Sequence, residues 1–122
     1  MPLSEHFTDD TFIYLVRPFY NRGNVLRAMK EKGINLLAER ELKSGAKTVL
    51  KALNSIHRAG YLHGNVRPQS IFQDKFDGED RGLIVLGKYE FCCPIDMWVE
   101  QPPYFEKSLA RLLYLAPEAI ES

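Results

Sequence analysis

The sequence predicts an α+β fold that is mainly α-helical and contains a short β-hairpin. Residues 38–58 repeat apolar side chains every three or four positions, which is the spacing of one helix face. Residues 71–72 and 83–86 are short apolar runs, and the polar connection between them contains the turn pair Asp77-Gly78. The 122 residues are about the length of one domain, so these elements are expected to share one core.

The first third of the chain predicts a lead, a strand and a short helix. Residues 1–11 form an acidic N-terminal lead. Residues 12–16 are apolar and rich in aromatic and β-branched types, which predicts a largely buried strand. After a turn, Asn24 can cap a helix of about two turns that stops at Gly33.

The helix predicted at 38–58 is the longest element. Its apolar stripe is expected to be buried, with the lysines on the other side. Gly45 lies in the helix interior, where glycine costs about 1 kcal/mol relative to alanine, and Gly60 suits a left-handed cap at the end. The stripe consists of Leu42, Ala46, Val49, Leu50, Leu53 and Ile56.

The charge balance and the cysteine content limit the classes of function that the sequence supports. Basic and acidic residues balance at 16 each, which argues against a nucleic-acid partner. No apolar run approaches the roughly 18 residues of a membrane span, and the acidic start resembles no leader, so an intracellular setting is expected, cytoplasmic by default. Cys92 and Cys93 are adjacent and lack further ligands nearby, so they are interpreted as small packed hydrophobes. No metal and no cofactor are assigned.

Residues 88–115 show no sustained period before Leu109, which predicts an irregular loop with exposed apolar content. Trp98, Tyr104 and Phe105 lie in this loop. They could fill a groove of the domain itself. They could equally anchor a protein partner, because aromatic side chains are enriched at binding hot spots.

Between the long helix and the hairpin lies a polar loop, HGNVRPQS, which begins at His63. Its order and spacing resemble the catalytic loop of the eukaryotic protein kinases, in which His-Arg-Asp is followed by a lysine and an asparagine. The sequence Leu-Ala-Pro-Glu at 115–118 also resembles the end of the kinase activation segment. His63 and Pro68 match the loop pattern. Gly64, Asn65, Arg67 and Ser70 stand where the family has Arg, Asp, Lys and Asn.

The resemblance assigns expectations to several residues. It places Arg17 at the gatekeeper position and residues 18–20 at the hinge that binds adenine; alternatively, Arg17 simply faces solvent. It implies that His63 packs inward, either as a core histidine or as a catalytic one. Arg67 would contact a phosphate or lie on the surface without a role. Leu86 or Gly87 falls at the position of the magnesium-binding Asp, and neither side chain can bind a cation.

We therefore expect residues 12–122 to form a partial kinase-like large lobe, with the N-terminal lobe and the later helices absent. Because Asn65 cannot act as a base and the magnesium ligands and phosphate loop are missing, the chain is predicted to be a pseudokinase and not an enzyme. It would act as a scaffold or structural subunit by binding proteins. Two alternatives remain: an atypical nucleotide-binding or active kinase fragment completed by another chain, and a small α/β interaction domain that converges on one loop.

Overall fold

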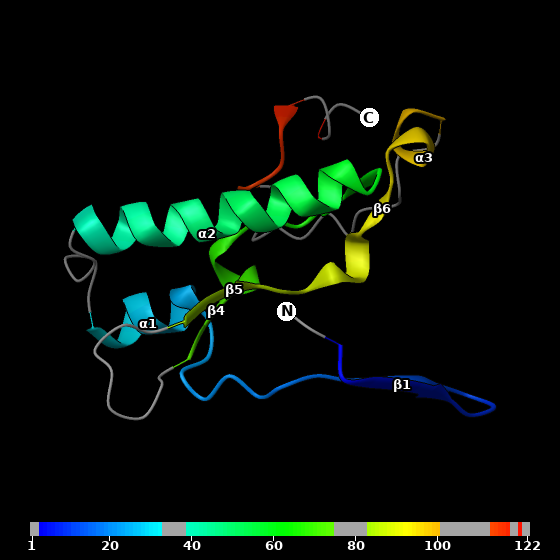
Figure 1. Cartoon of the computed structure of the whole chain (residues 1–122), viewed down its shortest axis with the longest axis horizontal. Coiled ribbons are helices and arrows are strands. Elements are labelled where there is room, and N and C mark those ends of the chain that lie inside the picture. Colours follow the sequence, from blue (N-terminus) through cyan, green and yellow to red (C-terminus); the bar gives the residue numbers. More distant parts are fainter. Residues whose placement is uncertain (1–2, 33–38, 75–82, 101–112, 118–119, 121–122) are drawn as a thin grey trace.

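A computed structural model describes residues 3–32, 39–74, 83–100, 113–117 and 120 of the chain. Within these ranges it contains three two-stranded antiparallel sheets, three α-helices and two short 3-10 helices. Figure 1 shows the longest helix, α2, lying across the β4–β5 hairpin, while the ribbon of β1 and β2 extends away from them. The chain is therefore a partial α+β unit in which one helix and one hairpin form the centre.

The N-terminal ribbon consists of β1 (Glu5–Thr8) and β2 (Ile13–Val16). The strand predicted at 12–16 is confirmed, but the prediction that it is largely buried is wrong, because all four residues of β2 are exposed. Its strand partner is β1, and both faces of the ribbon carry exposed apolar side chains. Sequence analysis predicted no strand inside the lead at 1–11, where β1 lies.

Helix α1 (Val25–Lys32) begins where the sequence predicts. The side-chain Oδ1 of Asn24 accepts a hydrogen bond from the backbone N–H of Arg27 at 3.0 Å, which confirms the cap. The preceding turn is tied to the hairpin, because the Gln73 N–H donates to the Gly23 carbonyl at 2.9 Å. The predicted stop at Gly33 lies outside the described residues.

Helix α2 (Glu39–Arg58) confirms the long helix, and Gly60 adopts the predicted left-handed conformation with φ of 82°. It packs on β5 (Leu83–Leu86) and on β3 (Tyr61–Leu62). Gly45 is buried because the helix comes so close to β5 that a Cβ there would lie 2.7 Å from Cδ1 of Ile84. None of the described helices is both long and apolar enough to cross a membrane.

The buried side of α2 differs from the predicted stripe. The stripe that is at least partly buried runs through Gly45, Val49, Leu53 and Ile56. Leu50 is 64% exposed, and Leu42 and Ala46 are also exposed, so the stripe prediction is wrong for these three residues. The close contact between Gly45 and Ile84 determines which face of α2 packs on the hairpin. Leu42, Ala46 and Leu50 lie beside that face.

The hairpin is confirmed as β4 (Ile71–Asp74) paired with β5 (Leu83–Leu86), in a register that places Ile71 opposite Leu86. The predicted turn at Asp77-Gly78 lies outside the described residues. After the hairpin come a 3-10 helix, η3 (Tyr89–Phe91), the strand β6 (Cys93–Pro94) and the helix α3 (Ile95–Glu100).

The prediction of an irregular loop is therefore wrong for residues 89–100. Strand β6 pairs with β3 (Tyr61–Leu62), and the Ile95 N–H donates to the Gly60 carbonyl at 3.0 Å. These contacts join segments about thirty positions apart in the sequence, so no local periodicity could reveal them. Residues 101–112 of the predicted loop lie outside the described ranges.

Candidate functional site

His63 lies at the centre of the site and is 1% exposed. Its ring Nε2 lies 2.9 Å from the carbonyl oxygen of Gly87, and its Nδ1 accepts a hydrogen bond from the Asn65 N–H at 3.2 Å. A neutral ring with the proton on Nε2 satisfies both contacts. The ring also packs edge-on against Tyr89, with centroids 5.0 Å apart. The prediction that His63 packs inward is confirmed, and both ring nitrogens are used in holding the backbone.

Burial lowers the pKa of His63 below its ordinary value near 6.5. The Gly87 carbonyl and the nearby Glu90 carboxylate both act in the opposite direction, but desolvation of the ring is the larger influence. A protonated ring would also point an N–H at the N–H of Asn65. The site therefore favours the neutral imidazole.

Ser70 closes the loop and is fully buried. The 3-10 helix η2 (Pro68–Ser70) brings its hydroxyl to the Asn65 carbonyl, to which it donates at 2.7 Å. The Ser70 carbonyl accepts from the N–H of Gly87 at 2.8 Å. Together, residues 63–70 and 86–89 form what we call the loop joint. The loop joint is held together by hydrogen bonds between backbone groups and the side chains of His63 and Ser70.

Gly64 has a structural role that sequence analysis missed. Its φ of 69° is in the left-handed region, and a Cβ there would lie 2.6 Å from the carbonyl oxygen of Phe91. The arginine of the kinase pattern therefore cannot occupy this position unless η3 moves. The sequence shows only that a glycine lies in this loop. It does not show that Phe91 lies close enough to exclude a side chain there.

Three buried polar atoms in the loop joint have no hydrogen-bond partner among the described residues: Asn65 Oδ1, Arg67 Nε and Gln69 Oε1. Leaving such an atom unsatisfied costs about 1–3 kcal/mol. The three atoms belong to alternate residues of one loop. Asn65 as a whole residue is only 6% exposed. The loop therefore keeps two acceptors and one guanidinium donor out of contact with solvent and without a hydrogen-bond partner among the described residues.

The positions that the resemblance assigns to magnesium do not fit that ion. Ser70 uses its hydroxyl proton on the Asn65 carbonyl, and Gly87 has no side chain. Across the residues that the structure describes, no group of three or more His, Cys, Asp or Glu could hold a metal ion. Magnesium prefers carboxylate and phosphate oxygens, so this donor set is unsuited to it.

Residues 17–20, which the kinase resemblance assigns to the gatekeeper and the hinge, lie beside the loop joint. The Arg17 guanidinium lies 3.9 Å from the Glu90 carboxylate with its side chain 25% exposed, so Arg17 does not simply face solvent. Tyr20 is buried and its ring packs 6.1 Å from that of Phe72 in β4. By contrast, Phe19 is 88% exposed. Of the three hinge residues, one anchors the segment and one presents a large apolar surface.

The cysteines confirm their predicted packing role. Both are free thiols, with Cys93 buried in β6 and Cys92 half-buried before it. Burial raises the pKa of the Cys92 thiol above its usual value, and the neighbouring Cys93 acts in the same direction. Thiols with a raised pKa are poor nucleophiles at neutral pH, which agrees with a packing role.

The predicted partner-binding aromatics are not brought together in the described ranges. Trp98 lies on α3, but its side chain is not among those described, and Tyr104 and Phe105 lie outside the described residues. Whether they fill a groove of this domain or anchor a partner stays open. The exposed apolar residues that sequence analysis missed lie instead on the N-terminal ribbon.

A helix that delivers a His-centred loop into a hairpin is the arrangement expected of a protein kinase-like unit, and comparisons with curated proteins show that relationship. The chain is 29% identical to mouse myotonin-protein kinase over 119 residues, which is 95% of this chain and 17% of that protein. It is 33% identical to human serine/threonine-protein kinase VRK3 over 88 residues, covering 70% of this chain and 18% of that protein. No protein-family profile matches the chain.

A third relative is the liver/testis isoform of the rat phosphorylase b kinase gamma catalytic chain, 25% identical over 119 residues, covering 98% of this chain and 27% of that protein. The chain thus spans less than a third of each of these relatives and is related to part of a kinase-like domain. The relationship extends along most of the chain, well beyond the loop joint.

These relatives correct one prediction. The chain was predicted not to be an enzyme, on the strength of Asn65, Ser70 and Gly87 and the missing phosphate loop. Its relatives are named as protein kinases, which points to a kinase and contradicts that prediction. The prediction rested on a few positions within one stretch of chain, whereas the similarity covers nearly all of it.

Proposed function

We propose that this chain is a protein kinase-related module that acts through protein–protein binding, as a scaffold or structural subunit, with residues 12–122 as its kinase-like unit. The exposed apolar surface of the N-terminal ribbon carries this proposal. Phe12 and Ile13 are 62% and 74% exposed, and Leu15 is exposed beside them. Clustered exposed apolar side chains mark interaction sites, and an isolated two-stranded hairpin is marginally stable in water.

The free thiols Cys92 and Cys93 support an intracellular, reducing setting as part of the same proposal. In this proposal the loop joint holds the shape of the module.

The test compares the intact chain with a variant that carries Phe12→Ser and Ile13→Ser, with Phe19→Ser as a matched exposed control. All three chains are used as bait for stoichiometric capture, and amide hydrogen exchange of β2 is measured with and without the captured protein. We expect a partner that is lost with the double variant and that protects β2. A chain that is monomeric, unfolds cooperatively and already protects β2 by itself would contradict the proposal.

A second candidate function is an atypical nucleotide-binding or active kinase fragment completed by another chain. Arg67 favours it, because Arg67 forms no ion pair with any residue that the structure describes and its guanidinium could pair with a phosphate. Thermal unfolding is measured with and without millimolar ATP and magnesium. Binding to the folded state would raise the midpoint by several degrees, and Arg67→Gln would remove the shift. Equal midpoints for all samples, with the captured partner present as well, would eliminate this candidate.

A further inference from the structure

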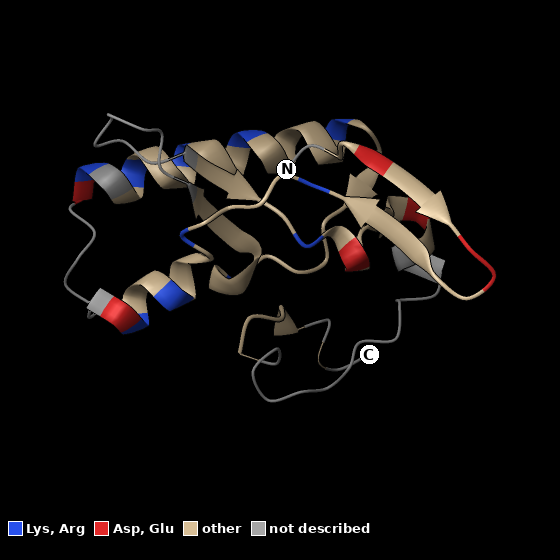
Figure 2. Ribbon diagram, turned by 90° about the horizontal axis from the view of Figure 1, so that it is seen from below, with Lys and Arg blue, Asp and Glu red and all other residues tan. Residues whose placement is uncertain are grey.

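Charge is segregated along the chain although its formal net charge is zero. Between residues 42 and 73 there is no Asp or Glu, while this stretch carries five Lys and Arg residues. Figure 2 shows basic positions recurring along α2, whereas acidic residues gather at the turn of the N-terminal ribbon. Lys43, Lys47 and Lys51 follow one another at every fourth position, so they form a row along one side of α2, about 6 Å apart along its axis.

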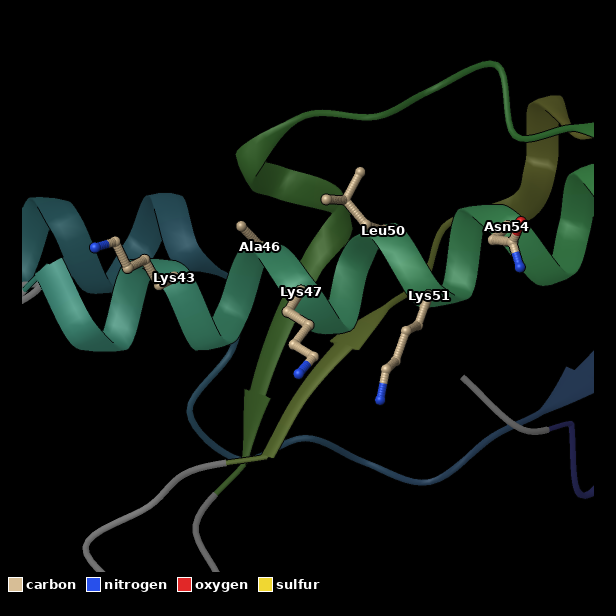
Figure 3. Close-up of a pocket in the computed structure, with 6 residues that line it drawn as sticks. All are labelled: Lys43, Ala46, Lys47, Leu50, Lys51 and Asn54. Carbon is tan, nitrogen blue, oxygen red and sulfur yellow. The ribbon is translucent and has the colours of Figure 1, made fainter.

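This row borders an open groove of about 460 Å³ on the surface of α2. In Figure 3, Ala46 and Leu50 point to one side of α2, and Lys47 and Lys51 point to the other. Leu50 is a large apolar side chain left 64% exposed, with exposed Leu42 two turns before it. The groove is lined by Lys43, Ala46, Lys47, Leu50, Lys51 and Asn54.

Lys47 and Lys51 are available to bind a partner protein. Lys43 pairs with Glu39 at 2.6 Å, and both side chains are highly exposed, so solvent screens this pair and it is worth little. Lys47 and Lys51 form no ion pair with any residue that the structure describes. The groove thus combines, on one side, two cations that no described residue compensates and, on the other, the apolar side chains of Ala46 and Leu50.

We infer that this groove docks an acidic amphipathic helix of a partner protein, with its carboxylates opposite Lys47 and Lys51 and its apolar side chains on Ala46 and Leu50. The groove spans residues 43–54, about three helical turns, which matches a helix that lies in a groove through anchors one turn apart. A nucleic acid would use the lysines but would gain nothing from Leu50. The inference rests on the proposed protein-binding function and adds a second surface, remote from the ribbon.

The test uses a designed, fluorescein-labelled helical peptide of about four turns, with Leu at three- and four-residue spacing and Glu on the flanking side. Fluorescence anisotropy follows its binding to the intact chain. We expect saturable binding that weakens with salt, and a loss of about tenfold or more in affinity for Lys47→Glu with Lys51→Glu. Leu50→Ser should weaken binding at every salt concentration. Lys30→Glu, a single charge reversal at an exposed position of α1, is the control and should bind as the parent does.

A peptide of opposite charge tests whether the lysines themselves determine the binding. A peptide in which Lys replaces Glu should bind the Lys47→Glu, Lys51→Glu chain and not the parent chain, and circular dichroism should show that all variants keep their helix content. Binding that ignores these changes would overturn the inference. So would a labelled single-stranded DNA that binds more tightly than the peptide and ignores Leu50→Ser. Either result leaves capture through Phe12 and Ile13 unaffected, so failure of the groove and failure of the proposed function are distinguishable.

Discussion

The N-terminal ribbon and the loop joint both join short segments through backbone hydrogen bonds, but the two regions differ in how far their side chains are buried. In the ribbon, Phe7 stacks on Tyr14 with ring centroids 4.8 Å apart, but every strand residue stays exposed. In the loop joint, His63, Ser70 and Leu86 are almost completely buried. The difference shows that backbone hydrogen bonds alone do not make a core. A second layer must cover the paired segments, as α2 covers β5 beside the loop joint.

The largest expected difference between the two regions is the cost of removing an aliphatic side chain. Leu86→Ala should lower the free energy of unfolding by about 2–5 kcal/mol, because Leu86 is 1% exposed and a cavity would remain. Ile13→Ala, in the ribbon, should change it by less than about 0.5 kcal/mol, since Ile13 is 74% exposed. Urea unfolding of both variants provides the comparison. Equal losses would show that the ribbon is as much a part of the core as the hairpin.

The next effect concerns two glycines that share a left-handed backbone. Gly64→Ala should cost about 2–4 kcal/mol, since the new Cβ also meets the Phe91 carbonyl. Gly60→Ala should cost only about 1 kcal/mol, because no atom lies within 4 Å of its Cβ position. Both are measured from denaturant midpoints at a constant slope. Equal stability of the two variants would contradict the close approach of the Phe91 carbonyl to Gly64.

Ser70→Ala removes the hydrogen bond from the hydroxyl to the Asn65 carbonyl and should cost about 1–2 kcal/mol. Ser55→Ala is the matched control: its hydroxyl donates to the Lys51 carbonyl at 3.1 Å, but Ser55 is exposed. Water replaces that bond, so the control should be nearly neutral. A neutral Ser70→Ala would mean that the hydroxyl does not hold the loop closed.

The pH dependence of stability should contain a contribution from His63. Its folded-state pKa lies below the value of about 6.5 expected when unfolded, so the unfolded chain takes up a proton first as pH falls. The contribution is complete above that unfolded value and is lost as pH falls toward the folded-state pKa. Unfolding free energies are measured between about pH 7 and pH 5 for the parent, His63→Gln and the exposed-site control His57→Gln. His63→Gln should show the shallower dependence, and a slope identical to the parent's would contradict a buried neutral ring.

The smallest effect is expected at the turn of the ribbon. The Asp9 carboxylate accepts hydrogen bonds from the N–H groups of Thr11 and Phe12 and from the Tyr14 hydroxyl, and these bonds lower its pKa. Asp9→Ala should speed hydrogen exchange at Phe12 and leave the global denaturation midpoint unchanged. A shift of the global midpoint would show that the ribbon unfolds together with the hairpin.

The sequence predicts those elements whose pattern is local. Helix α2 repeats its apolar residues over five turns, and the Asn24 cap precedes α1 directly, so both are visible without a structure. The pairing of β3 with β6 was missed, because two-residue strands carry no periodicity. The exposure of Leu50 was also missed, because the contact between Gly45 and Ile84 decides which face of α2 is buried.

Within the site, the sequence identifies the residues but only partly identifies their roles. The inward position of His63 follows from the kinase resemblance and is confirmed. Gly64 was interpreted as the loss of an arginine, although its neighbour Phe91 explains why no side chain fits there. The unsatisfied atoms of Asn65 and Arg67 depend on burial, which the letters of a loop do not encode.

The contact between His63 and residue 87 has a consequence for how such a chain can change over time. The imidazole bonds the main-chain carbonyl of Gly87, and the N–H of Gly87 bonds Ser70. Every amino acid supplies that carbonyl, so the bond places no demand on the side chain at this position. The anchor can therefore persist after residue 87 changes, provided that the buried site around Gly87 accommodates the new side chain.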